Sequence, residues 1–308
     1  MASRWFRRAA LAVLTAAVLG GFAAFLVGQS THIAETYALR PRTFAAVAGL
    51  ILATLALRSL ANQRLFRCLG VSASTWDWFR LVTLESLSNT LPFSAGLVAK
   101  AVYLKRVHAF RYGSFALGQI SLMVMILATH GALGLAALFL WLPESAASPI
   151  GAVFALMGAS GVLLFLPDRI ARRIGGRWLP AEAASPAVVR PAGPGVALLQ
   201  AAILLIHAAS LKLCFALGPS QVEFAACVVF STAIVLTRLV PITPGGIGIR
   251  ELLIGGLAHA TGFDLSDAVI AASAVRIVET VLIFTLGGVF SYQMAGIAME
   301  SPREPPPP

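Results

Sequence analysis

The sequence contains few charged residues. Asp, Glu, Lys and Arg make up only 12% of its 308 residues, whereas about a quarter of a typical soluble domain is charged. Hydrophobic residues account for 58% of the chain. Several apolar runs reach the roughly 20 residues that a helix needs to cross a bilayer. The composition therefore excludes a soluble globular protein and predicts an all-α, polytopic membrane protein.

The few cysteines and histidines form no pattern of metal ligands. Cys68, Cys214 and Cys227 lie in or beside apolar runs, so we interpret them as small buried residues. The histidines include no HExxH pair, and the sequence has no Walker loop or nucleotide-binding fingerprint. We therefore expect no metal and no cofactor.

The net charge of +10 comes from basic residues in short loops between the apolar runs. This is the positive-inside pattern of an inner-membrane protein, and we do not expect nucleic-acid binding. Arg4, Arg7 and Arg8 predict a cytoplasmic N-terminus, followed by a retained first helix rather than a cleaved signal peptide. The basic loop around Arg172 and the C-terminus are expected on the same side.

The apolar runs predict about six transmembrane helices in a single domain, residues 1–299. A proline-rich tail over residues 300–308 should have no structure of its own. A flexible cytoplasmic linker over 179–195 should separate two halves of the domain. The expected full spans are 9–28, 43–61, 115–141, 149–167, 196–217 and 267–293.

Two further apolar segments, 76–110 and 223–262, are interrupted by residues that break a helix, Pro92 in the first and the stretch 241–248 in the second. Open backbone at membrane depth is tolerated only where it is buried in protein or lines a wet cavity. The first segment has basic flanks and the second has acidic flanks, so we expect two re-entrant helical hairpins that enter from opposite faces. This arrangement is typical of an inverted repeat. The alternative is that 223–240 and 249–262 each cross, which gives eight spans.

Charged residues cluster around the second break and within the last span, where charge is costly and often marks a substrate path. Arginine side chains can hold a lipid phosphate by paired hydrogen bonds, and amides freed beside the glycines can add anion binding. The alternative is a structural role, in which Glu251 neutralises an arginine and Arg276 pairs with Glu279 one turn away. The candidate substrate-binding residues in this region are Arg238, Gly245, Gly246, Gly248, Arg250, Glu251, Arg276 and Glu279.

The first interrupted segment carries two further candidates, Glu85 and Asn89, which are four residues apart and share a helix face. They could line a cavity, or they could form hydrogen bonds between helices. We interpret Lys100 and Arg58 as long side chains that reach the membrane surface. His207, alone on an apolar run, is interpreted as a hydrogen-bonded core residue.

Three stretches resemble the lysylphosphatidylglycerol synthase transmembrane-region family of flippase-like membrane proteins. The most specific is Pro-x-x-Pro-Gly-Gly-x-Gly-x-Arg-Glu at 241–251, and the looser ones are Leu91–Gly96 and Tyr103–Arg106. In the best-known members this membrane region precedes a cytoplasmic aminoacyl-transfer domain and moves the lipid product across the bilayer. Stand-alone relatives have been linked to lipid-linked glycans. The resemblance implies roles for Arg250, Glu251 and the preceding glycines. We expect no synthase activity, because the sequence ends after the last apolar run.

The charge cluster and the resemblance together predict a lipid translocase. Its substrate would be a phospholipid or a polyprenyl-phosphate-linked lipid with an anionic headgroup, which would cross the inner membrane through a polar groove while its tails stay in lipid. The alternative is a membrane-embedded enzyme, or an accessory subunit, that acts on a lipid-linked glycan. An enzyme would need a general base or a nucleophile, and Glu85, Glu251 and Glu279 are the candidates. We favour the transporter over the enzyme.

Overall fold

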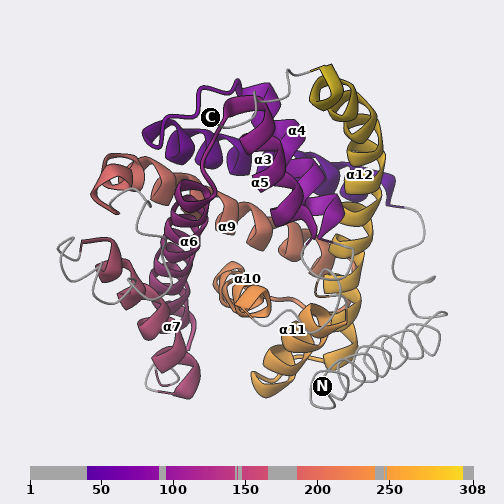
Figure 1. Ribbon diagram of the computed structural model, residues 1–308. Coiled ribbons are helices and arrows are strands. Elements are labelled where there is room, and N and C mark those ends of the chain that lie inside the picture. The colour runs from indigo at the N-terminus through magenta and orange to yellow at the C-terminus, as the bar shows by residue number, and fades with distance from the viewer. Residues whose placement is uncertain are drawn as a thin grey trace, which may run out of the picture.

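The computed structural model describes residues 40–89, 95–142, 144, 148–165, 186–239, 246 and 248–300, and every regular element in these residues is a helix (Figure 1). The expected all-α, polytopic fold is confirmed. The helices are α3 (Pro41–Cys68), α4 (Thr75–Ser88), α5 (Ala95–His108), α6 (Tyr112–Trp141), α7 (Pro149–Ala159), η2 (Ser160–Phe165), η3 (Pro186–Ala192), α9 (Gly193–Phe215), α10 (Phe224–Leu239), α11 (Ile249–Ala260) and α12 (Leu265–Glu300).

Four helical stretches are long and apolar enough to cross a membrane, and they are Pro41–Cys68, Tyr112–Trp141, Val188–Phe215 and Leu265–Gln293. They agree with four of the six expected spans. The expected span 9–28 lies outside the described residues. The expected span 149–167 is a shorter apolar unit, because α7 has 11 residues and continues as the 3₁₀ helix η2 to Phe165.

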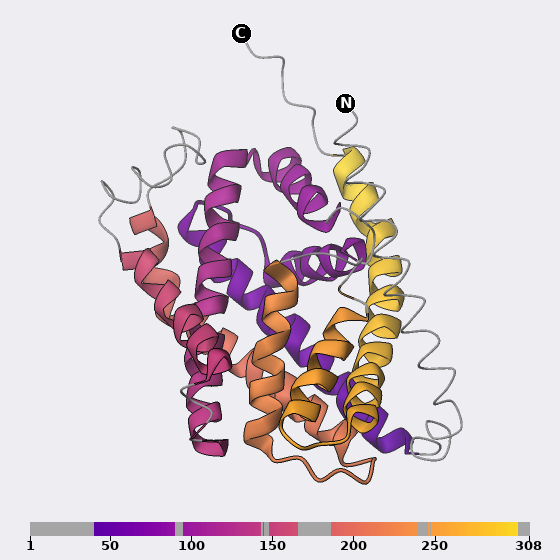
Figure 2. The same cartoon turned by 90° about the horizontal axis from the view of Figure 1, so that it is seen from below.

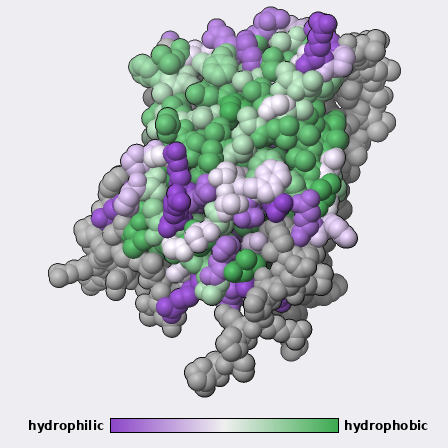
Figure 3. Space-filling model, turned by 90° about the horizontal axis from the view of Figure 1, so that it is seen from above, coloured by the Kyte–Doolittle hydropathy of each residue, from purple (hydrophilic) through white to green (hydrophobic). Residues whose placement is uncertain are grey.

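The short helices α10 and α11 lie inside the bundle, whereas α7 lies at its edge (Figures 1 and 2). In Figure 2, α12 (yellow) and α6 (magenta) run along opposite sides of the molecule, α3 (indigo) crosses it diagonally, and α10 and α11 (orange) lie between them. One buried core surrounds Phe230, whose ring packs against Trp141 and Phe263. A second core surrounds Phe66, which packs against Trp78. The surface in Figure 3 has a broad apolar zone with polar residues above and below it, as a bilayer requires.

The two interrupted segments each form a pair of short helices. α4 and α5 have 14 residues each, and α10 and α11 have 16 and 12. All four are shorter than the roughly 20 residues of a full crossing. In each pair the two helices pack against each other, and α4, α5 and α11 also contact α12. Pro92 and Gly245, which we expect to meet near the midplane, lie outside the described residues.

Local sequence explains where these short helices begin. α4 starts with a capping box in which Ser74 and Asp77 satisfy each other's backbone amides. α11 starts after Gly248, whose φ of +83° is strained for any residue with a Cβ atom.

The prediction of a flexible linker over 179–195 is wrong for the last part of this range. η3 begins at Pro186 and leads directly into α9 at Gly193.

A glycine allows α4 and α5 to approach each other. A Cβ atom at Gly96 would lie 2.2 Å from the carbonyl oxygen of Glu85 and 2.9 Å from Oδ1 of Asn89. The backbone oxygen cannot move aside without disturbing α4. Close helix contact through small residues is typical of membrane proteins. The α4–α5 pair therefore depends on this position.

We expect Gly96→Ala to destabilise the protein by about 1–3 kcal/mol, because the added methyl group overpacks the α4–α5 contact. The midpoint of thermal unfolding in detergent would report the loss. Gly49→Ala is the matched control, since a Cβ atom on that α3 glycine meets nothing within 4 Å. An unfolding midpoint for Gly96→Ala equal to that of Gly49→Ala would contradict the close packing.

Candidate functional site

Two arginines from different helices share one carboxylate. Nη1 of Arg250, on the first turn of α11, lies 2.9 Å from Oε2 of Glu279 on α12. Nη1 of Arg276, one turn before Glu279 on the same helix, lies 3.3 Å from the same oxygen. Between 11% and 19% of each of these side chains is exposed. The structure therefore brings together three of the charged residues that the sequence singled out.

Glu251 has a different role from the one considered for it. It is fully buried, and its Oε2 accepts a hydrogen bond of 2.7 Å from the backbone amide of Gly248. Glu251 thus caps the first turn of α11, where backbone amides lack helical partners. Arg250 pairs with Glu279 and not with Glu251 among the described contacts, whereas the side chain of Arg238, the other arginine that Glu251 could neutralise, lies outside the described part of the structure. The amide of Gly248 is likewise occupied, so it is not free to bind an anion.

The structure describes only some of the other candidate residues around the second break. Arg238 is the penultimate residue of α10, but its side chain lies outside the described part of the structure, as does Gly245. Gly246 has a φ of +71°, and a Cβ atom there would lie 3.8 Å from Oγ1 of Thr237. The chain therefore returns beside the last turns of α10 before α11 begins.

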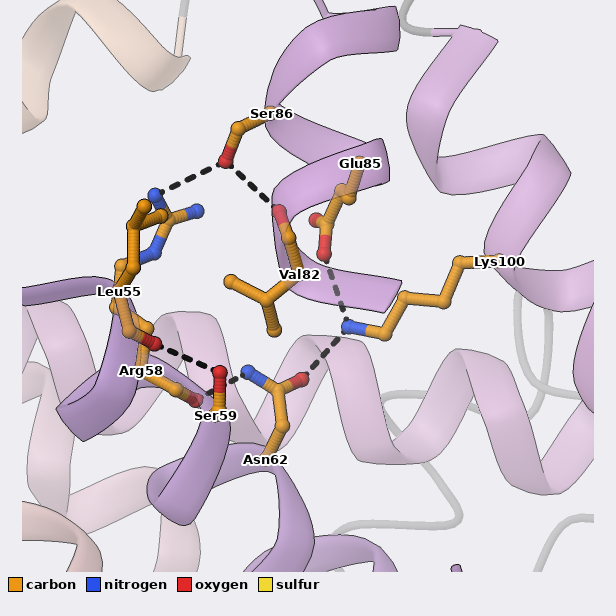
Figure 4. A network of polar contacts seen from close by, with 8 residues as sticks. All are labelled: Leu55, Arg58, Ser59, Asn62, Val82, Glu85, Ser86 and Lys100. Atoms are coloured by element: carbon orange, nitrogen blue, oxygen red, sulfur yellow. Dashed lines mark hydrogen bonds and ion pairs between the residues drawn. The ribbon is translucent and has the colours of Figure 1, made fainter. Parts of the chain in front are cut away.

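The candidates of the first segment belong to a second ionic group (Figure 4). Lys100 on α5 donates to Oε2 of Glu85 at 3.0 Å and to Oδ1 of Asn62 at 2.6 Å. Its ammonium also lies 5.5 Å from the ring centroid of Phe66 and 5.6 Å from that of Trp78. The side chain is completely buried. Our interpretation of Lys100 as a side chain that reaches the membrane surface is wrong.

Asn89 is the C-terminal cap of α4, and it does not join the Lys100 group among the described contacts. Its Oδ1 is buried and has no hydrogen-bond partner there. A buried carbonyl oxygen without a partner is able to accept a hydrogen bond from a ligand. The alternative explanation is that tight packing against Gly96 keeps hydrogen-bond donors away from this oxygen. Glu85 and Asn89 therefore share α4 but take part in different contacts.

Sequence reasoning missed two residues near these groups. Arg58 on α3 donates to Oγ of Ser86 on α4 at 3.3 Å and interacts electrostatically with Glu279. His207 on α9 also interacts electrostatically with Glu279. The available signal was the charge of Arg58 inside an apolar run, ten residues before the end of a 28-residue helix. A position that deep favours an inward-facing side chain.

The arrangement is suited to holding an anion. Two guanidinium groups face one carboxylate, so the Arg250–Glu279–Arg276 group carries an excess positive charge. Nε of Arg250 is buried and has no hydrogen-bond partner among the described residues. Arginine donors in a fixed planar fork match the oxygens of a phosphate or carboxylate. No group of three or more potential metal ligands occurs in the described part of the chain.

We expect Glu279→Gln to lower the free energy of unfolding by about 1–3 kcal/mol, because it leaves two adjacent arginines with no carboxylate. Arg276→Gln should cost less, since it leaves Arg250 and Glu279 as a balanced pair. Thermal unfolding of the two variants in the same detergent tests the order. A larger loss for Arg276→Gln would show that Glu279 is not the centre of the group.

One known family of membrane proteins matches this sequence. The family described as the lysylphosphatidylglycerol synthase TM region matches residues 9–287, which include both interrupted segments and both ionic groups. A search of curated proteins finds no match. The family match covers most of the chain, and four helical stretches are able to span a membrane. The chain therefore belongs to the lysylphosphatidylglycerol synthase TM region family and is a multi-pass membrane protein involved in lipid handling.

Proposed function

We propose that this protein moves a phospholipid or a polyprenyl-phosphate-linked lipid across the inner membrane. The observation that carries the proposal is the Arg250–Glu279–Arg276 group, in which two arginines share one carboxylate beside the start of α11, the helix that follows the second break. Charges at such positions commonly mark a substrate path. Membership of a family involved in lipid handling supports the same conclusion.

In the proposed mechanism the phosphate of the headgroup replaces Glu279 as the partner of the arginines. Arg250 and Arg276 would each donate hydrogen bonds to phosphate oxygens, while the acyl or prenyl tails remain in the surrounding lipid. Glu279 pairs again with the arginines when the headgroup leaves, so the empty site never holds two unpaired guanidinium groups. This exchange leaves the two arginines compensated both while the headgroup is bound and after it leaves.

The two pairs of short helices would provide the polar path. We propose that α4–α5 forms a re-entrant hairpin from the cytoplasmic side and that α10–α11 forms one from the opposite side. The shortness of all four helices supports this arrangement. Lys105 and Arg106 in the last turn of α5, and Glu223 just before α10, support the orientation.

Accessibility of single cysteines should report this topology. We expect Arg106→Cys to react with an impermeant thiol reagent only from the cytoplasmic side, and Glu223→Cys only from the opposite side. Both positions are exposed. The three native cysteines are replaced first, although Cys214 and Cys227 are fully buried. Labelling of both positions from one side would exclude opposed hairpins.

We expect Arg250→Gln to reduce lipid movement at least tenfold, because the loss of one charge-assisted hydrogen bond is worth about 1.5–3 kcal/mol. The assay follows fluorescent phosphatidylglycerol in proteoliposomes that contain the purified protein. An impermeant reductant removes the fluorescence of lipid in the outer leaflet, so the slower loss that follows measures the movement of lipid from the inner leaflet. Arg67→Gln is the matched control, since Arg67 is exposed at the end of α3 and has no ion pair in the described structure.

A double variant separates binding from stability. Arg250→Gln with Glu279→Gln removes the pair without leaving its carboxylate unpaired, so it should be more stable than Glu279→Gln alone and still inactive. Wild-type rates of lipid movement in a stable Arg250→Gln protein would show that the arginine pair does not bind the transported headgroup. Wild-type protein that moves no phosphate-bearing lipid in this assay would contradict the proposed function itself.

A further inference from the structure

Arg58 lies between the two ionic groups. It is on α3, a helix that packs against both α4 and α12. Its guanidinium donates to Ser86 beside Glu85, and it interacts electrostatically with Lys100 in one group and with Glu279 in the other. Figure 4 shows Arg58 reaching α4 from one side while Lys100 reaches it from the other. Arg58 therefore lies within electrostatic range of both groups, although it forms no ion pair with either among the described residues.

Arg58 also lacks an ion pair. Lys100, Arg250 and Arg276 each have a carboxylate within 4.0 Å, but no carboxylate comes that close to Arg58 among the described residues. Its one hydrogen bond, 3.3 Å to the Ser86 hydroxyl, uses one of five guanidinium donors. A half-buried arginine at this depth is costly unless something compensates its charge.

The described charges around the two groups do not balance. Four cationic side chains (Lys100, Arg58, Arg250 and Arg276) face three carboxylates (Glu85, Glu251 and Glu279) in this part of the molecule. Glu251 caps α11, so only Glu85 and Glu279 compensate cations directly. The arginine left without a carboxylate is the one between the groups. An anion would find there guanidinium donors that have no partner among the described residues.

We infer that Arg58 is a second phosphate-binding position, which receives the lipid headgroup after it leaves Arg250 and Arg276. This inference rests on the proposed function and adds a transfer step to it. Because Glu279 interacts with arginines on both sides, a phosphate that moves to Arg58 frees Arg250 and Arg276 to pair with Glu279 again. The headgroup would pass from Arg250 and Arg276 to Arg58, and Glu279 would compensate the first site once it is empty.

Two substitutions of Arg58 test this role in the same proteoliposome assay. Arg58→Gln keeps a long polar side chain that can bond to Ser86 but removes the charge, so we expect the maximal rate of phosphatidylglycerol movement to fall about tenfold. The lipid concentration at half-maximal rate should stay within about twofold of wild type, since the first binding position is intact. Arg58→Lys keeps the charge without the fork and should retain an intermediate rate.

Ser86→Ala is the matched control for a structural role. It removes the hydrogen-bond partner of Arg58 and leaves the guanidinium in place. If Arg58 served only to join α3 to α4, Ser86→Ala would reproduce both the loss of rate and the drop in unfolding temperature. If Arg58 binds phosphate, Ser86→Ala should move lipid at a rate within about threefold of wild type, because one neutral hydrogen bond is worth less than a charged one.

The outcomes separate this inference from the proposed function. Wild-type rates in Arg58→Gln, together with loss of transport in Arg250→Gln, would overturn the transfer position and leave the translocase intact. Wild-type rates in both variants would overturn both. If Arg58→Gln fails to fold, Arg58→Lys decides the question, since a wild-type rate in this variant would exclude a need for the paired donors of arginine. A fall in rate equal to that of Ser86→Ala would also overturn the inference.

Discussion

The polar interior of this protein depends on one electrostatic constraint, namely that a charge taken out of water must be compensated by another charge. Glu279 meets the constraint for two arginines at once, at 2.9 and 3.3 Å from their Nη1 atoms. These contacts join α11 to α12 across the second broken segment. The position of the short helix α11 therefore follows from the ion pairs as much as from its apolar face.

A second constraint acts on the backbone, because amides exposed by a break must find partners inside the membrane. Glu251 meets it for α11 by accepting a hydrogen bond from the amide of Gly248. Adjacent residues of one motif thus have separate tasks. Arg250 reaches out to α12, whereas Glu251 turns back to its own helix.

Much of the fold could be read from composition and apolar length. The runs around Ile51, Met125, Leu204 and Val281 predict long helices, and the structure has long helices at these places. Pro92 and the Pro-Gly stretch before Arg250 correctly indicate shorter helices on either side of each break. The end of α7 at Ala159 could not be predicted, because the residues that follow are equally apolar in the 3₁₀ helix η2.

The site was harder to predict, because partners come from helices far apart in the sequence. Spacing shows that Arg276 and Glu279 share a helix face, but nothing in the sequence places Arg250 against the same carboxylate. Sequence proximity favours Glu251 as its partner, and packing decides otherwise. Lys100 was assigned to the membrane surface because lysine usually reaches it. Only the tertiary structure shows Asn62, Glu85 and two aromatic rings around its ammonium.

The buried Lys100 contact has a mechanical consequence. It ties α5 to α3 through Asn62 and to α4 through Glu85, and all of these atoms are shielded from solvent or nearly so. Breaking these bonds would expose an ammonium to a low-dielectric interior, so α3, α4 and α5 should rock as one rigid body. This body meets α12 at a smooth point, where the side chain of Leu87 rests on the bare backbone of Gly287.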